Sequence, residues 1–322
     1  MALRVAYFDA PEIGRGIASP DRFSLRQVVL TVTALTGFAL TLGDMALESN
    51  IVTAAACAAL LVFGLPHGSL DLALLRRADR TGPVRLAAII LLYLGCAATM
   101  YVIWHMVPVA ALALFLIVAC VHFAEDWADG VPPFFATGIA AAILTGPTFA
   151  HRDALAAIFV RLTGSEAATL VADIATLLAP VAFVTAGLGL LIMVRTGRRA
   201  RACEAGLVLA AMVVLPPVIG FALFFCLSHS PVQFAAASAD LGGAQKLRHP
   251  GEVSLLTLAA LGIAGAIYLA SGGNSLGDGA VRASFITLSI LTIPHMIMPL
   301  LLQTRSRRAA AFCKTRDSSC IE

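Results

Sequence analysis

The stretch FGLPHGSLDLALLRR, which runs from Phe63 to Arg77, carries a histidine and an acid inside a segment that is otherwise almost wholly apolar. His67 and Asp71 are four residues apart, so a helix places both side chains on one face, one turn apart. Ionisable groups are costly to bury in such a segment and mark candidate functional sites. The stretch therefore predicts a helix that carries part of a site.

The composition of the whole chain indicates an integral membrane protein. Of its 322 residues, 59% are hydrophobic and 13% are charged, and the mean hydropathy is +0.90. A soluble domain carries about 25% charged residues. The long apolar runs favour helices over the alternating strands of a membrane barrel, so we expect an all-α, polytopic helical bundle. The net charge of +3 lies mostly in loops and speaks to topology, not to a nucleic-acid partner.

Apolar segments of about the length that a bilayer span requires recur along the chain. They cover residues 27–46, 51–75, 85–104, 108–127, 133–150, 170–194, 203–215, 217–238, 253–271 and 282–303. The seventh is short, and Pro216-Pro217 separates it from the eighth, so the two form either two spans or one broken span. With ten spans and a cytoplasmic N-terminus, the main basic clusters all face the cytoplasm, as the positive-inside rule favours. We predict about ten transmembrane helices, with eight or nine as alternatives.

The division of the chain follows from these segments. We expect a cytoplasmic N-terminal tail over residues 1–26, one transmembrane domain over 27–303 and a basic cytoplasmic C-terminal tail over 304–322. The first residues lack the apolar stretch of a cleaved signal, so we expect a multi-pass protein of the inner membrane with both termini in the cytoplasm. The seven cysteines form no CxxC motif, and we interpret them as free packing thiols.

Three further histidines lie in apolar segments, namely His122, His229 and His295. In the ten-span topology, the segments that carry these three and His67 run in the same direction. Each histidine lies at a similar distance past the start of its segment, so the four imidazoles fall at about one depth. Metal sites between the helices of a bundle are built in this way. A single such histidine is more often a satisfied core residue, and a GxxxG packing motif also explains Gly64 and Gly68, but four at one level indicate a joint metal site.

The segment from His122 to Trp127 reads HFAEDW and places Glu125 and Asp126 three and four residues after the histidine. The acids and the tryptophan also fit a membrane edge, where tryptophan is enriched. For Glu125 this edge reading is the simpler one. His122 lies deeper, so we keep it as a candidate ligand.

The segment around His229 predicts a local irregularity in its helix. Pro231 has no N–H, so the carbonyl of Leu227 loses its usual helical partner. Such a carbonyl is tolerated in a membrane helix where another group satisfies it. Gln233 follows His229 by four residues and can offer an oxygen to a metal or satisfy a buried donor. His295 likewise follows a proline.

These segments together resemble the Brp/Blh family of membrane-embedded β-carotene 15,15′-dioxygenases. The resemblance lies in GLPHGSLD at Gly64–Asp71, HFAED at His122–Asp126, the pair His229-Ser230, and IPHM at Ile293–Met296. It implies Fe²⁺ held by histidines, and molecular oxygen that cleaves the central double bond of β-carotene to two retinals. It also implies a link to the supply of retinal to microbial rhodopsins, with a rhodopsin as a candidate partner.

On this resemblance the expected site is as follows. Metal ligands are His67, His122 and His229, with Gln233 or His295 as further ligands, and the acids that orient the ligands are Asp71 and Asp126. One departure concerns the third motif, where the family pattern looks like HSxxH and this chain has Gln233 at the last position. An amide oxygen binds iron less well than an imidazole, so this departure bears on activity and not on the fold.

Two other classes of function stay open from the sequence. Gln233 motivates a non-catalytic carrier of a carotenoid or retinoid, or a rhodopsin-associated membrane protein. A transporter with a polar site inside the membrane is a further reading, which the lysine-free interior and the lack of obvious inverted halves disfavour. The expected partners are β-carotene or a related carotenoid, molecular oxygen and the lipid bilayer, with no nucleic acid.

Overall fold

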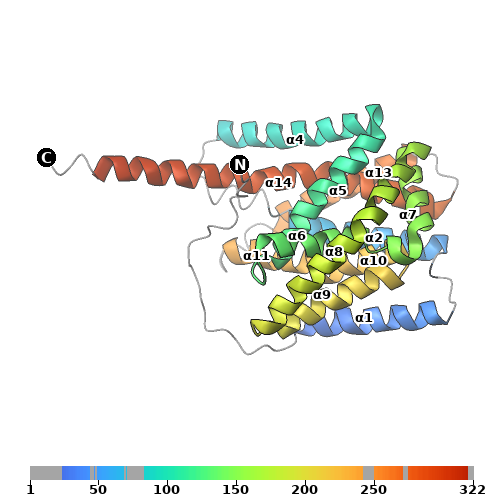
Figure 1. Cartoon of the computed structure of the whole chain (residues 1–322). Helices are drawn as coiled ribbons and strands as arrows, with labels where there is room; N and C mark the ends of the chain where they lie inside the picture. The colour runs from blue at the N-terminus through green and yellow to red at the C-terminus, as the bar shows by residue number, and fades with distance from the viewer. Residues whose placement is uncertain are drawn as a thin grey trace.

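Every element that the structure describes is helical (Figure 1). The computed structural model describes residues 24–43, 47, 49–68, 70, 83–241, 250–270 and 275–317. The elements are α1 (Leu25–Leu42), α2 (Asn50–Gly68), α4 (Pro83–Met106), α5 (Pro108–Ala124), η2 (Glu125–Trp127), α6 (Pro133–Thr145), α7 (Thr148–Thr163), η3 (Glu166–Ala168), α8 (Thr169–Arg195), α9 (Arg199–Val214), α10 (Pro217–Phe224), the π-helical turn η4 (Phe225–His229), α11 (Ser230–Leu241), α13 (Pro250–Ala270) and α14 (Leu276–Asp317). No strand occurs among these residues, which confirms the all-α prediction.

Six described helical stretches are long and apolar enough to cross a membrane. They are Leu25–Leu42, Ala87–Met106, Pro108–Trp127, Glu166–Arg195, Pro217–Ala239 and Leu276–Ile297. The pair α6 and α7, bent by 66° at a short break, makes a seventh if it counts as one span. The expected count of about ten is therefore not confirmed over the described residues. Helix α9 spans 16 residues, and the apolar parts of α2 and α13 are likewise shorter than a full span.

The outer surface of the bundle carries many exposed apolar side chains. On α8, Leu177, Val181 and Val184 are 78%, 67% and 66% exposed, and on α4 Leu91 is 68% exposed. Soluble monomers rarely expose extended apolar surface of this kind, whereas lipid chains solvate it without cost. The surface thus agrees with the apolar helices in indicating a membrane protein.

Proline marks the starts of several helices. Pro108, Pro133 and Pro217 occupy the first position of α5, α6 and α10, where the missing N–H would have had no helical partner. Between α9 and α10 the backbone at Leu215 is extended, so Pro216-Pro217 ends one helix and begins the next. The expected break between the seventh and eighth segments is therefore present.

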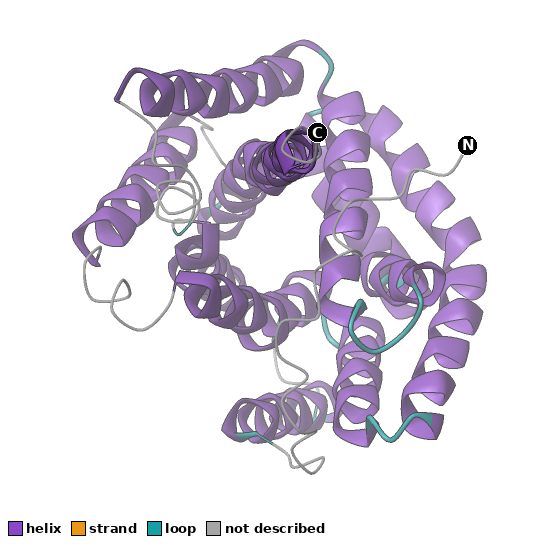
Figure 2. Cartoon of the chain, turned by 90° about the vertical axis from the view of Figure 1, so that its left-hand side faces the viewer, coloured by secondary structure: helices purple, strands orange, loops and turns teal. Residues whose placement is uncertain are grey.

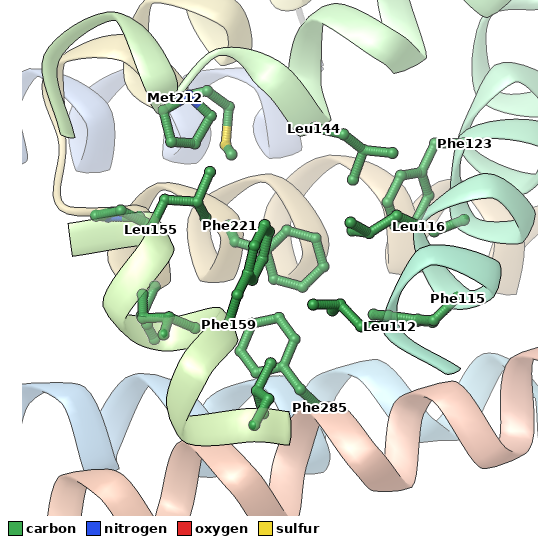
Figure 3. A pocket seen from close by; sticks show the side chains of 16 residues that line it. Leu112, Phe115, Leu116, Phe123, Leu144, Leu155, Phe159, Met212, Phe221 and Phe285 are labelled. Atoms are coloured by element: carbon green, nitrogen blue, oxygen red, sulfur yellow. The ribbon is translucent and has the colours of Figure 1, made fainter. Parts of the chain in front are cut away.

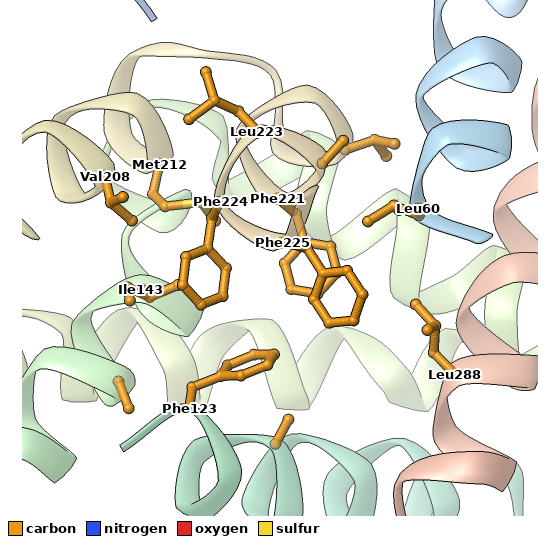
Figure 4. Packing of buried hydrophobic residues seen from close by; sticks show 14 of the residues in the cluster. Leu60, Phe123, Ile143, Val208, Met212, Phe221, Leu223, Phe224, Phe225 and Leu288 are labelled. Atoms are coloured by element: carbon orange, nitrogen blue, oxygen red, sulfur yellow. The ribbon is translucent and has the colours of Figure 1, made fainter. Parts of the chain in front are cut away.

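The helices surround a buried aromatic centre. Figure 1 shows α4 and α14 side by side along one flank and α1 beside α9 on the opposite flank. Helix α2 lies inside, in contact with α14, α13, α11 and α10, and Figure 2 shows the same bundle end-on, with the C-terminal helix running toward the viewer. The phenylalanines Phe123, Phe221, Phe224 and Phe225 pack together at the centre (Figure 4). This centre directly adjoins the predicted histidines.

Two expected segments differ from the structure in extent. The segment expected to end at residue 150 continues after the bend as α7, with non-helical backbone angles at His151, because Pro147 follows Gly146 at the junction of α6 and α7. The last segment, expected over 282–303, belongs to one helix that runs from Leu276 to Asp317. The boundary between membrane domain and C-terminal tail is therefore not a break in secondary structure.

Candidate functional site

Three of the four predicted histidines meet at the aromatic centre. The rings of His122 and His229 have centroids 4.7 Å apart and cross at 83°. The rings of His122 and His295 have centroids 5.1 Å apart and cross at 79°. His122 ends α5, His229 ends the π-helical turn and His295 lies within α14, so three helices distant in sequence each contribute one imidazole. His122 and His229 are buried, at 3% and 0% exposure.

The end of helix α2 borders this histidine cluster. His67 is the penultimate residue of α2, and its side chain lies outside the described residues, as does the whole of Asp71. The next residue, Gly68, faces His295, since a Cβ atom built on Gly68 would lie 3.8 Å from His295 Nδ1. The backbone of α2 thus brings the position of His67 to the cluster.

Gly64 allows α2 to approach the π-helical turn closely. A Cβ atom built on Gly64 would lie 2.3 Å from Cε1 of Phe225, a separation that real Cβ atoms do not adopt. The hydroxyl of Ser230 donates to the carbonyl of Phe63 at 2.6 Å, which ties the same two elements. The expected close approach at Gly64 is confirmed, and it serves packing as well as the site.

This contact leads to a stability prediction. A Gly64→Ala variant should lose about 1–3 kcal/mol of stability, because the added methyl group overpacks against Phe225. Thermal unfolding in detergent micelles measures the loss. Gly95→Ala on α4 is the matched control, since nothing lies within 4 Å of its Cβ position, and it should be neutral or slightly stabilising. Equal melting temperatures for the two variants would contradict the close approach.

Asp126 holds His229 in place. Its Oδ2 lies 2.7 Å from Nδ1 of His229, and its Oδ1 accepts a hydrogen bond of 2.8 Å from Nε2 of Gln233. A guanidinium nitrogen of Arg201 also donates to the backbone carbonyl of Asp126. A carboxylate on Nδ1 fixes the tautomer of an imidazole so that Nε2 carries the lone pair, which is the usual arrangement around a metal-binding histidine. Gln233 therefore contacts the site through Asp126.

Glu125 takes the corresponding position on His122. Its Oε2 lies 3.3 Å from Nδ1 of His122, and its side chain is 20% exposed. The sequence made a membrane-edge role the simpler interpretation of Glu125, but the structure places it on the imidazole. The physical reason is that the chain turns into the 3₁₀ helix η2 directly after α5, which brings the carboxylate back toward His122.

The irregularity predicted at Pro231 is a π-helical turn with its own cap. The five residues Phe225–His229 form the turn, and the carbonyl of Leu227 accepts a hydrogen bond of 3.1 Å from the guanidinium of Arg26. The expectation that another group satisfies this carbonyl is confirmed. The donor comes from the start of α1, about 200 residues away in the chain, so α1 fixes the turn that presents His229.

A buried carboxylate, Glu204, connects the same elements. Its side chain has 0% exposure and forms an ion pair with Arg26 through contacts of 2.5 and 2.8 Å. Ser228, next to His229, donates to it at 2.7 Å, and Arg201 donates at 3.2 Å. Glu204 is therefore the centre of a polar network that positions both His229 and the residue that binds Asp126.

The sequence contained signals for this network that the motif search did not use. Glu204 is a lone acid in the apolar segment 203–215, and Arg26 lies at the edge of the first apolar segment. The rule that singled out Asp71, namely that ionisable groups are costly in apolar segments, applies equally to Glu204. The pairing with Arg26 could not be read from the sequence, because it depends on how α1 packs against α9.

The donor set fits a divalent metal in kind. The three imidazoles converge, and two of them have a carboxylate beside Nδ1, which suits divalent iron. Among the residues that the structure describes, no group of three His, Cys, Asp or Glu side chains is closed around a point in the manner of a loaded site. The fourth expected imidazole, His67, falls outside that set.

Comparisons with known proteins point to one family. A family model described as Beta-carotene 15,15′-dioxygenase matches residues 58–303. A Beta-carotene 15,15′-dioxygenase from the uncultured marine bacterium 66A03 is 28% identical over 259 residues, covering 74% of this chain and 90% of that protein. A Probable beta-carotene 15,15′-dioxygenase Blh from Halobacterium salinarum is 27% identical over 279 residues, covering 74% of this chain and 81% of that protein. No solved structure matches the chain significantly.

The family match and the geometry concern the same residues. The matched range 58–303 contains His67 and every residue of the histidine cluster, and it leaves out only the beginning of the chain, with α1, and its end. Because the match spans well over half of the sequence, the chain belongs to the β-carotene 15,15′-dioxygenase family, an enzyme family that cleaves carotenoids.

Proposed function

We propose that this protein uses Fe²⁺ and molecular oxygen to cleave β-carotene, or a related carotenoid, at its central double bond to give retinal. The observation that carries the proposal is the convergence of His122, His229 and His295 within a family of carotenoid-cleaving dioxygenases. The relatives supply the substrate class through their names. The apolar helices supply the setting, a membrane in which a carotenoid dissolves.

In this proposal the chain's histidines hold the metal. His67, His122 and His229 are ligands, and His295 is a further ligand because its ring lies 5.1 Å from that of His122. Bound iron supplies the means of activating oxygen for reaction with the polyene. Gln233 donates to Asp126 through its amide nitrogen, so its first role is to position that acid, and only its amide oxygen is left for the metal.

The other residues orient the ligands and keep the site dry. Asp126 and Glu125 hold the imidazoles of His229 and His122 through Nδ1. Phe123 and Phe225 pack against His229, with ring centroids 4.9 and 5.0 Å from its ring. Aromatic rings on this side present an apolar wall against which a polyene can lie, and they keep water away from the reacting carbons.

The outer carboxylate gives a quantitative prediction. An Asp126→Asn variant should lose about 10- to 100-fold in iron affinity or retinal formation, since such acids orient the ligand and raise its basicity. Asp129→Asn is the matched control, because its side chain is 70% exposed and contacts only surface arginines in the described structure. Iron titration of both purified variants separates them. An Asp126→Asn protein with native affinity and turnover would contradict the role of Asp126.

Production of retinal in cells tests the proposed reaction. The native chain, a Gln233→His variant and an empty vector are expressed in bacteria that accumulate β-carotene, and retinal is measured by chromatography. Retinal from the native chain supports an active oxygenase in which glutamine is tolerated. Retinal from Gln233→His alone supports a scaffold impaired at one position. Retinal from neither, with unaltered pigment bound to the purified protein and no iron, favours a carotenoid or retinoid carrier.

A further inference from the structure

An apolar cavity adjoins the histidine cluster (Figure 3). It lies mainly between α5, α7 and α10, with Phe285 of α14 and Met212 of α9 closing its sides. The space between the lining atoms amounts to about 590 Å³, including the open space at its mouth. This size falls in the range of small-molecule sites, about 300–1,000 Å³.

The walls of the cavity offer a ligand no hydrogen bond from a side chain. All 16 described residues that line it are leucine, isoleucine, valine, alanine, proline, phenylalanine or methionine. The space that a water-sized sphere can enter, about 50 Å³, is large enough for water, but water needs two or more polar partners to stay in a cavity. Such a cavity stays dry and accepts hydrocarbon.

Aromatic contacts connect the cavity to the cluster. Phe123 lines the cavity, follows His122 in the chain, and packs edge-on against His229 at 4.9 Å. Phe221 also lines it and stacks on Phe225 at 5.5 Å, which in turn contacts His229 at 5.0 Å. A chain of apolar rings therefore leads from the imidazoles into the cavity, and an apolar ligand can follow the same course.

We propose that this cavity receives one terminal ring of the carotenoid and selects a ring without a hydroxyl group. The inference rests on the proposed function, because it takes the cluster as the place of the central double bond. A carotenoid held at its centre extends one arm to each side, and the cavity takes one of these arms. A hydroxylated ring would lose its hydrogen bonds to water in the cavity and gain none from the lining side chains.

Three substrates that differ only in ring hydroxyls test the selection. β-Carotene has none, β-cryptoxanthin has one and zeaxanthin has two. With the purified full-length protein, kcat/KM for zeaxanthin should be roughly 10- to 100-fold lower than for β-carotene, the discrimination that an apolar pocket achieves against a hydroxyl. β-Cryptoxanthin should keep about half of the β-carotene value, because one of its two orientations places the plain ring in the cavity.

Each other result overturns the proposal. Zeaxanthin cleaved as fast as β-carotene would show that the cavity takes no ring or does not discriminate. β-Cryptoxanthin as slow as zeaxanthin would show that both ring sites reject hydroxyls, and not one cavity. Pigment retained by the purified protein is measured in parallel with the same expected order. If no carotenoid is cleaved, the proposed function fails, while the order of retention still decides the ring selection.

A cavity-filling variant locates the ring. Ala119 lines the cavity and is 1% exposed, so Ala119→Val and Ala119→Leu narrow it in two steps. Each preparation is assayed with β-carotene and with β-apo-8′-carotenal, which lacks one ring. The ratio of the two kcat/KM values should fall stepwise, by roughly tenfold for Ala119→Leu. A ratio that stays constant overturns the proposal, and because both substrates meet the same protein, partial unfolding does not change the ratio.

Discussion

A His122→Ala variant should lose iron retention and retinal formation together, by more than about 100-fold. The ring of His122 lies between those of His229 and His295, within 4.7 and 5.1 Å, so its removal takes away the imidazole that both others face. Loss of an outer carboxylate already costs about 10- to 100-fold at metal sites, and loss of a ligand should exceed that. Iron content by atomic absorption and retinal by chromatography measure the two effects.

The control for this variant is another histidine. His105→Ala removes an exposed imidazole at the end of α4 whose Nδ1 contacts the carbonyl of Tyr101, far from the cluster in the fold. It should keep native iron content and turnover. Full activity in His122→Ala, at a level equal to that of His105→Ala, would show that the histidine cluster is a packing feature and not the site.

A Glu204→Ala variant should destabilise the protein by about 3 kcal/mol. Breaking a buried ion pair by removing one partner costs about 3–5 kcal/mol, and the lower end applies because Arg26 and Arg201 retain 24% and 21% exposure. For a chain of this size the melting temperature should fall by roughly 6 °C. Iron retention should fall as well, since Ser228 and the turn that presents His229 lose their anchor.

A surface acid provides the comparison for Glu204. Asp173 pairs with Arg152 and is 53% exposed, so Asp173→Ala should change stability by about 0–1 kcal/mol. Glu204→Gln keeps the shape but removes the charge, and it should fall between Glu204→Ala and the native chain. A melting temperature for Glu204→Ala within 1 °C of Asp173→Ala, in about the same buffer and salt, would contradict the central position of Glu204.

The histidine cluster could be predicted from the sequence because each member stands out against its background. An imidazole in an apolar segment is conspicuous, and three such residues, His122, His229 and His295, do lie together in the structure. The distortion at Pro231 was equally predictable, since a missing N–H has a definite consequence for one carbonyl. The donor that satisfies it, Arg26, was not, because nothing local in the sequence relates α1 to the π-helical turn.

The helix count was harder to predict than the helical class. Apolar composition determines that the chain forms membrane helices, but not whether a given run crosses the bilayer. The 66° bend between α6 and α7 joins two runs of which the sequence analysis recognised one, and α9 is a short helix around the buried Glu204 network. Glu125 was misjudged for a similar reason, since three residues of 3₁₀ helix redirect its carboxylate in a way that residue spacing does not reveal.

The most direct test of the account is the product formed by the purified native protein from β-carotene, with and without iron. The account predicts retinal as the product with Fe²⁺ present, loss of retinal after iron is removed by a chelator, and recovery when Fe²⁺ is returned. β-Carotene that stays intact in all three conditions, although the protein is folded, would contradict it.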